Sequence, residues 1–193
     1  VEILSRVIGA RNGENAVHDS HVGTITRLLL EKITEKTDRY DLSWTERQAM
    51  TAAASFHDIG KIGIEEKLLH KENPTEKEKE RLREHTVIGD EILSSLREYQ
   101  GEDLVKYARQ ISRWHHERYD GSGYPDGLKG EEIPIAAQAV GLADTYGEIM
   151  EERRGCSPEE AIRVLQEEYR DAFQPLLLEC MWELKDKIQE VQD

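Results

Sequence analysis

The strongest chemical signal in the chain is the adjacent pair His57-Asp58, followed by Lys61 three residues after the aspartate. An imidazole and a carboxylate side by side can ligate the same metal ion, while the second carboxylate oxygen stays free to bridge to another ion. The pair stands at the end of the apolar stretch 52–56. A single His-Asp pair is also a common structural feature of helix ends, so the metal interpretation depends on the residues that accompany it.

Further imidazoles and carboxylates are distributed along the chain at suggestive positions. His115 and His116 are adjacent, about 100° apart on a helix, so both could reach one ion only from a helix end or a bend. Asp144 lies inside an apolar helical pattern, where a buried carboxylate is costly without a cation. The candidate metal ligands are Glu14, His18, His57, Asp58, His85, His115, His116 and Asp144. A set without thiolates suits manganese or iron at least as well as zinc.

The composition describes one globular domain with a strongly acidic surface. The length of 193 residues fits a single hydrophobic core, and 37% hydrophobic residues beside 34% charged residues is well away from the low-hydrophobicity composition that indicates disorder. The net charge of −14 repels nucleic acid backbones and anionic lipid, so long DNA or RNA is not an expected partner. No apolar run of about 20 residues and no signal peptide is present, so direct membrane insertion is not expected.

Two isolated cysteines, Cys156 and Cys180, form no ligand pair and are expected to be reduced thiols, which favours a cytoplasmic location. The apolar residues within 3–8 resemble a helix already in progress. We therefore expect one domain spanning 1–193, taken from a longer chain with an upstream sensor or receiver domain.

Helical periodicity dominates the chain, and no segment has a convincing strand pattern. Ser43 and Ser157 each precede a helical pattern and have a glutamate three residues later, which predicts capping boxes. Glycine and proline concentrate in residues 121–134 and predict an ordered loop there. The charged stretch 71–84 mixes both signs and predicts a solvated turn leading into an exposed helix. The fold expected is all-α, a helical bundle with one Gly/Pro-rich loop.

Two motifs give the chain a resemblance to a known family. Residues 57–64 read HDIGKIGI, and residues 115–134 read HHERYDGSGYPDGLKGEEIP. In this order and spacing they resemble the two signatures of HD-GYP domains, members of the HD superfamily of metal-dependent phosphohydrolases. The resemblance extends over residues 10–175.

The resemblance implies a bundle that holds two divalent ions, iron or manganese in the first place. One ion would be held by His18, His57, Asp58 and Asp144, and the other by Asp58, His85, His115 and His116, with Asp58 as the bridge. Glu14 matches the extra carboxylate of members with a third metal, and the third ion is left open.

Function follows from the same resemblance. We expect a phosphodiesterase that hydrolyses a cyclic dinucleotide, with cyclic di-GMP favoured over 3′,3′-cGAMP, through a metal-bridging hydroxide. Asp58 and Lys61 are the expected catalytic residues, because Lys61 could add positive charge where negative charge develops. Lys61, Tyr124 and Arg153 are the expected substrate-binding residues. For Lys61 and Arg153, an ordinary surface charge is the competing interpretation, and Tyr124 could instead shape a surface for partner proteins.

Several positions depart from the family pattern and keep alternatives open. Asn12, His21, Gln138 and Gly147 replace the usual Asp, Arg, Arg and Asp, and Phe173-Gln174-Pro175 replaces Phe-Asp-Pro. Changes around metal ligands can cost 10- to 100-fold in affinity or activity. The first alternative is a module that binds metal and nucleotide with little turnover and signals to diguanylate cyclase domains through the loop. The second is a phosphohydrolase acting on another phosphate ester, and a homodimer is left open.

Overall fold

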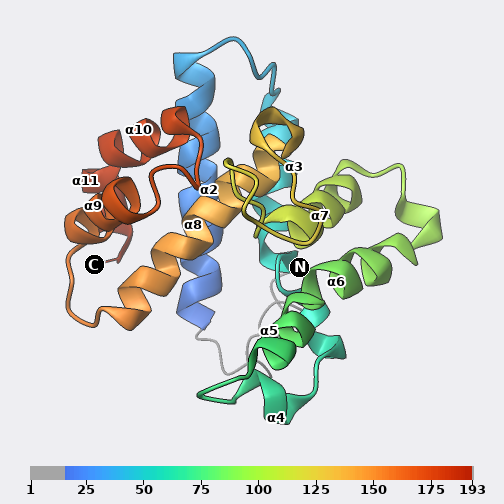
Figure 1. Ribbon diagram of the computed structural model, residues 1–193. Helices are drawn as coiled ribbons and strands as arrows, with labels where there is room; N and C mark the ends of the chain where they lie inside the picture. Colours follow the sequence, from blue (N-terminus) through green and yellow to red (C-terminus); the bar gives the residue numbers. More distant parts are fainter. Residues whose placement is uncertain (1–15, 193) are drawn as a thin grey trace.

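Helices joined by turns and loops make up the protein, of which the computed structural model describes residues 16–192 (Figure 1). No strand occurs in this described part. The α-helices are α2 (Ala16–Lys36), α3 (Trp44–Ala53), α4 (Glu66–Leu69), α5 (Glu76–Arg83), α6 (His85–Ser94), α7 (Asp103–Trp114), α8 (Ile135–Glu152), α9 (Pro158–Glu168), α10 (Pro175–Glu183) and α11 (Lys185–Gln192). The all-α prediction is confirmed.

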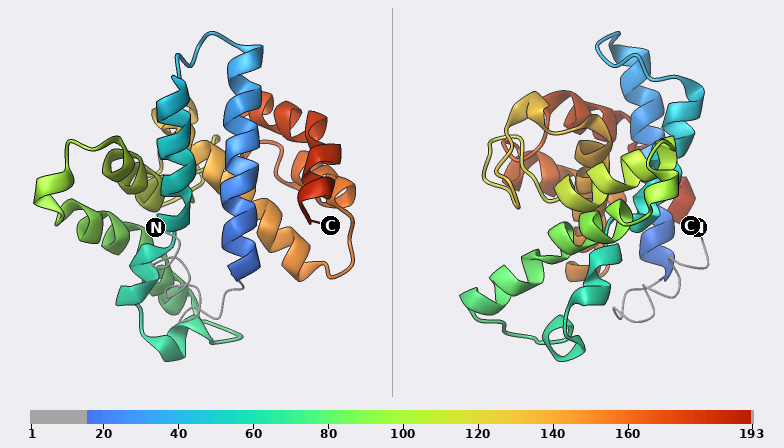
Figure 2. Two further views of the ribbon diagram at one scale, coloured as in Figure 1. Left: turned by 180° about the vertical axis from the view of Figure 1, so that it is seen from behind. Right: turned by 90° about the vertical axis from the view of Figure 1, so that its right-hand side faces the viewer.

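Two long helices, α2 and α8, pack across each other at the centre of the molecule. Helices α3, α6 and α7 lie on one side of this pair, and α9, α10 and α11 lie on the other (Figures 1 and 2). Helix α7 contacts α3, α6 and α8, so its C-terminal end is held between elements from distant parts of the sequence. This arrangement brings residues near positions 57, 85, 115 and 144 toward one another.

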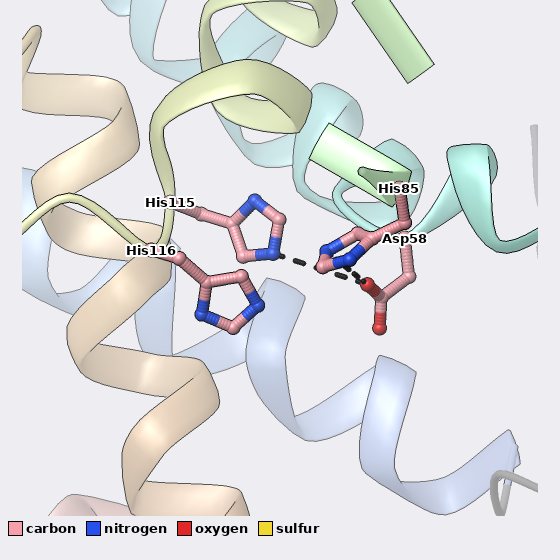
Figure 3. A group of neighbouring side chains, drawn as sticks. All are labelled: Asp58, His85, His115 and His116. Atoms are coloured by element: carbon pink, nitrogen blue, oxygen red, sulfur yellow. Dashed lines mark ion pairs between the residues drawn. The ribbon is translucent and has the colours of Figure 1, made fainter. Parts of the chain in front are cut away.

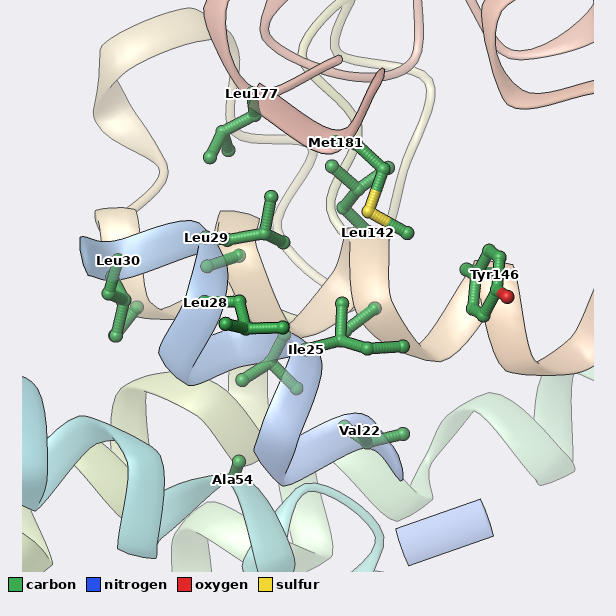
Figure 4. Packing of buried hydrophobic residues seen from close by; sticks show 14 of the residues in the cluster. Val22, Ile25, Leu28, Leu29, Leu30, Ala54, Leu142, Tyr146, Leu177 and Met181 are labelled. Atoms are coloured by element: carbon green, nitrogen blue, oxygen red, sulfur yellow. The ribbon is translucent and has the colours of Figure 1, made fainter. Parts of the chain in front are cut away.

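The core forms where the apolar stripe of α2 meets α8 and α10. Val22, Ile25 and Leu29 on α2 are spaced by three and four residues and are buried, as expected for one helix face (Figure 4). Leu142 on α8 and Leu177 on α10 are also buried in this cluster. Full burial of one such side chain contributes about 1.5 to 3 kcal/mol, so the scaffold beneath the polar site is well packed.

Helix boundaries follow the sequence signals. Ser43 and Ser157 form the two predicted capping boxes, in which each serine accepts a hydrogen bond from the backbone N–H three residues on. In each box the side chain of Glu46 or Glu160 accepts a hydrogen bond from the backbone N–H of the cap serine. The predicted exposed helix in the charged stretch is α5, which has no buried residue.

Two glycines allow backbone segments to approach closely at the site. A Cβ atom added to Gly60 would lie 1.8 Å from the carbonyl oxygen of His85, and one added to Gly141 would lie 2.2 Å from that of His115. No other residue type could occupy these positions without displacing the neighbouring backbone. The short 3₁₀ segment Ile59–Gly63 and helix α8 are thereby set directly against two of the predicted ligands.

Among the described helices, none combines the length and the apolar character that crossing a bilayer requires.

Candidate metal centre

His57 and Asp58 lie at a break between helical segments. Helix α3 ends at Ala53, a 3₁₀ turn covers Ala54–Phe56, and the next 3₁₀ segment begins at Ile59. Both side chains are nearly inaccessible to solvent, with 1% and 7% of their residue surfaces exposed. At this break the chain directs both polar side chains into the interior of the bundle.

Three more histidines converge on this pair from helix ends. His85 is the first residue of α6, and His115 and His116 directly follow the last residue of α7. This placement agrees with the first of the two predicted possibilities, that adjacent histidines could reach one ion only from a helix end or a bend. Figure 3 shows the three rings and the Asp58 carboxylate directed toward one another.

The two oxygens of Asp58 face different groups. Its Oδ1 lies 3.3 Å from Nε2 of His85 and 3.9 Å from Nε2 of His115. One donor atom from each of Asp58, His85, His115 and His116 lies within 4.8 Å of the others. This spacing could accommodate a metal ion among the four side chains.

The other oxygen of Asp58 faces a second group. Its Oδ2 lies 3.2 Å from Nε2 of His57 and 2.6 Å from Nζ of Lys61. The same His57 nitrogen lies 3.6 Å from Oδ1 of Asp144. Asp58 thus connects a His57-Asp144 group with the three-histidine group.

Hydrogen bonding fixes the tautomers of two candidate ligands. Nδ1 of His85 lies 2.8 Å from the carbonyl oxygen of Leu82, and Nδ1 of His115 lies 2.9 Å from that of Ile111. Because a carbonyl only accepts, each Nδ1 carries the proton and each Nε2 presents a lone pair. Within the described chain, these two Nε2 atoms and Oδ1 of Asp58 are buried and accept no hydrogen bond. Acceptors that face one another without a donor are costly, and a cation would satisfy all three.

Protonation states also suit a cation. Burial lowers the pKa of His115 to about 3, and burial likewise lowers the pKa of His85 and that of His116. Burial raises the pKa of Asp58, but Lys61 and His57 favour the ionised form more strongly and hold that pKa well below its usual range. Near neutral pH the three imidazoles are therefore neutral and the carboxylate is ionised, as metal ligation requires.

A cavity of about 480 Å³ opens beside the three-histidine group. Its lining residues are Lys61, Leu69, Lys79, Leu82, Arg83, His85, His116, Tyr124 and Glu148. The Tyr124 ring stacks on the His116 ring, with centroids 4.8 Å apart and an interplanar angle of 26°. Tyr124 therefore lies against a candidate ligand, as the sequence predicted.

Glu117, to which the sequence analysis gave no role, anchors the Gly/Pro-rich loop. Its buried carboxylate accepts hydrogen bonds from the backbone N–H groups of Asp126, Gly127 and Leu128, at 2.7 to 3.0 Å. The Asp126 carboxylate in turn accepts hydrogen bonds from Arg113 and from the indole N–H of Trp114. The loop that carries Tyr124 is thus tied to the histidine pair by the residues on either side of that pair.

Two further predicted ligands lie outside the part of the chain whose side chains are described, and a third predicted site residue, Arg153, lies away from the cavity. Glu14 lies outside the described residues, and His18 lies in the first turn of α2 with its side chain outside the described part. Arg153 is exposed at the end of α8, where its guanidinium pairs with Glu168 at 2.8 Å, and it does not line the cavity. Its role in phosphate binding stays a prediction that this arrangement does not support.

Two of the departures from the family pattern have structural partners. The Gln138 side chain is buried and donates to the carbonyl oxygen of Ile133 at 2.7 Å. The Gln174 side chain is buried and donates to Tyr40 and to Glu131, at 2.7 and 2.9 Å. These amides therefore join neighbouring segments by hydrogen bonds.

The chain belongs to the HD domain family, whose model matches residues 13–177. Its two motifs and its relatives assign it to the HD-GYP members of that family, confirming the resemblance seen in the sequence. A cyclic di-GMP phosphodiesterase of Thermotoga maritima is 34% identical over 195 residues, which cover 99% of this chain and 50% of that protein. The cyclic di-GMP phosphodiesterase response regulator RpfG of Xanthomonas campestris is 35% identical over 151 residues, 78% of this chain and 37% of that protein.

A 3'3'-cGAMP-specific phosphodiesterase 2 of Vibrio cholerae is 30% identical over 188 residues, 95% of this chain and 34% of that protein. The chain therefore spans half the length, or less, of these curated relatives. A solved structure, the HDGYP protein Bd1817 of Bdellovibrio bacteriovorus, matches 86% of this chain and 51% of its own with a TM-score of 0.65. At 18% identity this likeness supports the fold alone.

Proposed function

We propose that this chain is a metal-dependent phosphodiesterase domain that hydrolyses a cyclic dinucleotide, with cyclic di-GMP as the first candidate and 3′,3′-cGAMP as the second. The observation that carries the proposal is the position of Asp58, whose two oxygens face two separate groups of ligand side chains. Relatives named for hydrolysis of each of the two cyclic dinucleotides support both candidates.

The proposal assigns two divalent ions, iron or manganese, to these groups. The first would be held by Asp58, His85, His115 and His116, and the second by His18, His57, Asp58 and Asp144. A third ion, with Glu14 among its ligands, is a further part of the proposal. The buried lone pairs on His85 and His115 support the first assignment most directly.

Bound divalent ions would supply an activated water and charge stabilisation for an in-line attack on phosphorus. The chain's own residues would orient the substrate beside them. Lys61, already at the edge of the Asp58 carboxylate, would donate to a phosphate oxygen and offset the negative charge that develops on it. Tyr124, which also lines the cavity, would offer its ring or hydroxyl to the nucleotide.

The net charge of −14 does not oppose an anionic substrate. Lys61, Lys79 and Arg83 all line the cavity, so the local field differs from that of the surface as a whole. We also place the domain in the cytoplasm, where free thiols such as those of Cys156 and Cys180 persist.

The test is hydrolysis by protein loaded anaerobically with Fe²⁺ or Mn²⁺. Chromatography would follow cleavage of cyclic di-GMP and of 3′,3′-cGAMP, and elemental analysis would give the metal content of each sample. Asp58→Asn is expected to lose most of the bound metal and at least 100-fold in turnover, because the bridging anion becomes neutral. The exposed His70 offers a matched control, since His70→Asn should change neither quantity.

A second candidate is a module that binds metal and nucleotide without turnover. Gly147, which stands on α8 where a second aspartate is usual, favours it. Diguanylate cyclase domains contacting the 121–134 loop, and a homodimer, would be the partners of such a module. Full metal occupancy and nucleotide binding without cleavage of either cyclic dinucleotide would replace the first candidate with this one.

A further inference from the structure

Three planar groups stack outward from the candidate metal centre. The ring of His116 contacts the ring of Tyr124 at 4.8 Å between centroids, and the guanidinium carbon of Arg83 lies 5.1 Å from the centroid of Tyr124. Tyr124 therefore connects a candidate ligand with an arginine from a different helix. A guanidinium held over an aromatic face loses less side-chain freedom when it binds an anion.

Arg83 is available for such an anion. It is exposed, it lines the cavity, and within the described chain its guanidinium makes no ion pair. The neighbouring Arg81 differs, since it pairs with Glu84. Lys79 precedes Arg83 by four residues on α5 and therefore shares its helix face, and it also lines the cavity. Its ammonium pairs with the exposed Glu76 at 2.8 Å, a solvated contact for which a bound anion would compete.

The cations of the cavity form two separate groups. Lys61 pairs with Asp58 of the candidate metal centre, whereas Arg83 and Lys79 line the cavity from α5 and make no ion pair with the described candidate ligands. A cyclic dinucleotide carries two phosphodiesters on one small ring. When one of them occupies the metal centre, the other must lie a short distance away within the same cavity.

We propose that Arg83, held by Tyr124 and assisted by Lys79, binds the second phosphodiester of the substrate, the one that is not being cleaved. This inference rests on the proposed function, and it assigns the basis of selectivity for a cyclic dinucleotide over a simple phosphodiester. The planar guanidinium matches two phosphate oxygens at once, and the lysine adds a second charge.

The test compares two substrates in Arg83 variants of the metal-loaded protein. Cyclic di-GMP has two phosphodiesters, and bis(4-nitrophenyl) phosphate has only one. Arg83→Ala is expected to lower kcat/KM for cyclic di-GMP about 10- to 100-fold, mainly through KM, because a charge-assisted contact is lost. Its kcat/KM for the simple diester should change less than 3-fold.

Further variants separate charge from stacking. Arg83→Lys keeps the charge without the planar fork and should lie between wild type and alanine. Lys79→Ala should raise KM for cyclic di-GMP by a smaller factor than Arg83→Ala does. Arg81→Ala is the matched control on the same helix and should leave both substrates unaffected. Thermal unfolding of each variant would identify any that is not folded.

Each outcome is decisive. Equal losses on both substrates, or no loss on cyclic di-GMP, would overturn the assignment. If Arg83→Ala changes only the ratio of kcat/KM for cyclic di-GMP to kcat/KM for 3′,3′-cGAMP, the assignment is wrong, because Arg83 then recognises a base and not a phosphodiester. If the wild-type protein cleaves bis(4-nitrophenyl) phosphate but neither cyclic dinucleotide, the proposed function itself fails. Equilibrium binding of labelled cyclic di-GMP to wild type and Arg83→Ala would then still test the phosphate contact.

Discussion

Nζ of Lys61 lies 2.6 Å from Oδ2 of Asp58, the carboxylate oxygen that also faces His57. Asp58 and Lys61 are three residues apart, at the start of the 3₁₀ segment Ile59–Gly63. This segment can lie against the backbone of His85 because position 60 is a glycine. The Lys61 ammonium therefore lies beside the carboxylate that joins the two groups of candidate ligand side chains. Because Lys61 also lines the cavity, it faces both the Asp58 carboxylate and the cavity in which the substrate is proposed to bind.

Replacing Lys61 by methionine tests this double position. We expect kcat for cyclic di-GMP to fall about 100-fold, as when one donor to a developing oxyanion is removed. Metal content should not fall, since the variant leaves the anionic ligand intact and removes a competing cation. Lys67→Met, an exposed lysine on α4, is the control. Loss of metal in parallel with activity would show that Lys61 acts by organising Asp58 and not on the substrate.

Local structure around the site could be predicted from the sequence for identifiable physical reasons. The capping boxes at Ser43 and Ser157 are short-range and depend only on residues three apart. Helix geometry limited His115 and His116 to a helix end or a bend if both were to reach one ion, and the structure places them at the end of α7. The placement of Tyr124 against His116 agrees with the expectation drawn from the family resemblance.

The missed residues depend on tertiary contacts. Arg83 looked like one of many charges on an exposed helix, and only the fold shows that Tyr124 receives its guanidinium. Glu117 accepts hydrogen bonds from backbone N–H groups 9 to 11 residues away, and the sequence alone does not show which N–H groups a carboxylate will bind at that distance. The available signal was a carboxylate directly before a loop rich in glycine, where N–H groups lack helical partners.

Glu117→Gln should loosen the loop. One oxygen of Glu117 accepts from two backbone N–H groups and the other from a third, so an amide would point its own N–H₂ at a donor. We expect a loss of about 1.5 to 3 kcal/mol, which for this chain length lowers Tm by roughly 3 to 12 °C. Limited proteolysis should cut within residues 121–130 faster than in wild type.

The control for this substitution is Glu98→Gln, at an exposed position. Metal content is expected to stay near that of wild type in Glu117→Gln, because the carboxylate holds the loop rather than a cation. Unchanged Tm together with unchanged loop proteolysis would contradict the anchoring role.

The stability of the metal-free protein should fall as the pH is lowered. The pKa of His115 is about 3 in the folded chain, against about 6.5 when unfolded, so the unfolded state binds more protons below pH 6.5. Between pH 7.5 and pH 5.5 this one residue removes about 1.4 kcal/mol of folding free energy. Urea unfolding in the presence of a chelator, at both pH values, measures the change.

Substitution of His115 measures its own contribution to the pH dependence of the unfolding free energy. His115→Gln should reduce the difference in unfolding free energy between the two pH values by about 1.4 kcal/mol, whatever its effect on overall stability. His70→Gln, at an exposed position, should leave the difference as in wild type. An identical pH dependence in His115→Gln and wild type would mean that His115 is not held neutral by burial.

Glu148 should change folding stability with pH in the direction opposite to His115. It lies one helical turn after Asp144 and lines the cavity with Lys61 and Tyr124. Glu148 is exposed over its residue surface as a whole, but partial removal of its carboxylate from water and then the charge of Asp144 raise its pKa to about 7. Since the unfolded value is about 4.5, the folded state loses stability as pH rises from 4.5 through 7.

Glu148→Gln removes a charge that the folded state disfavours. The metal-free variant should therefore unfold at a higher temperature than wild type at pH 8, by a few degrees, with a smaller gain at pH 6. KM for cyclic di-GMP should also fall several-fold at pH 8, because the ionised carboxylate repels phosphate across the cavity. Glu152→Gln, two turns beyond Asp144 and exposed, is the control. A rise in KM for Glu148→Gln would instead mean that the carboxylate binds the nucleotide or a cation, and the repulsion argument would be wrong.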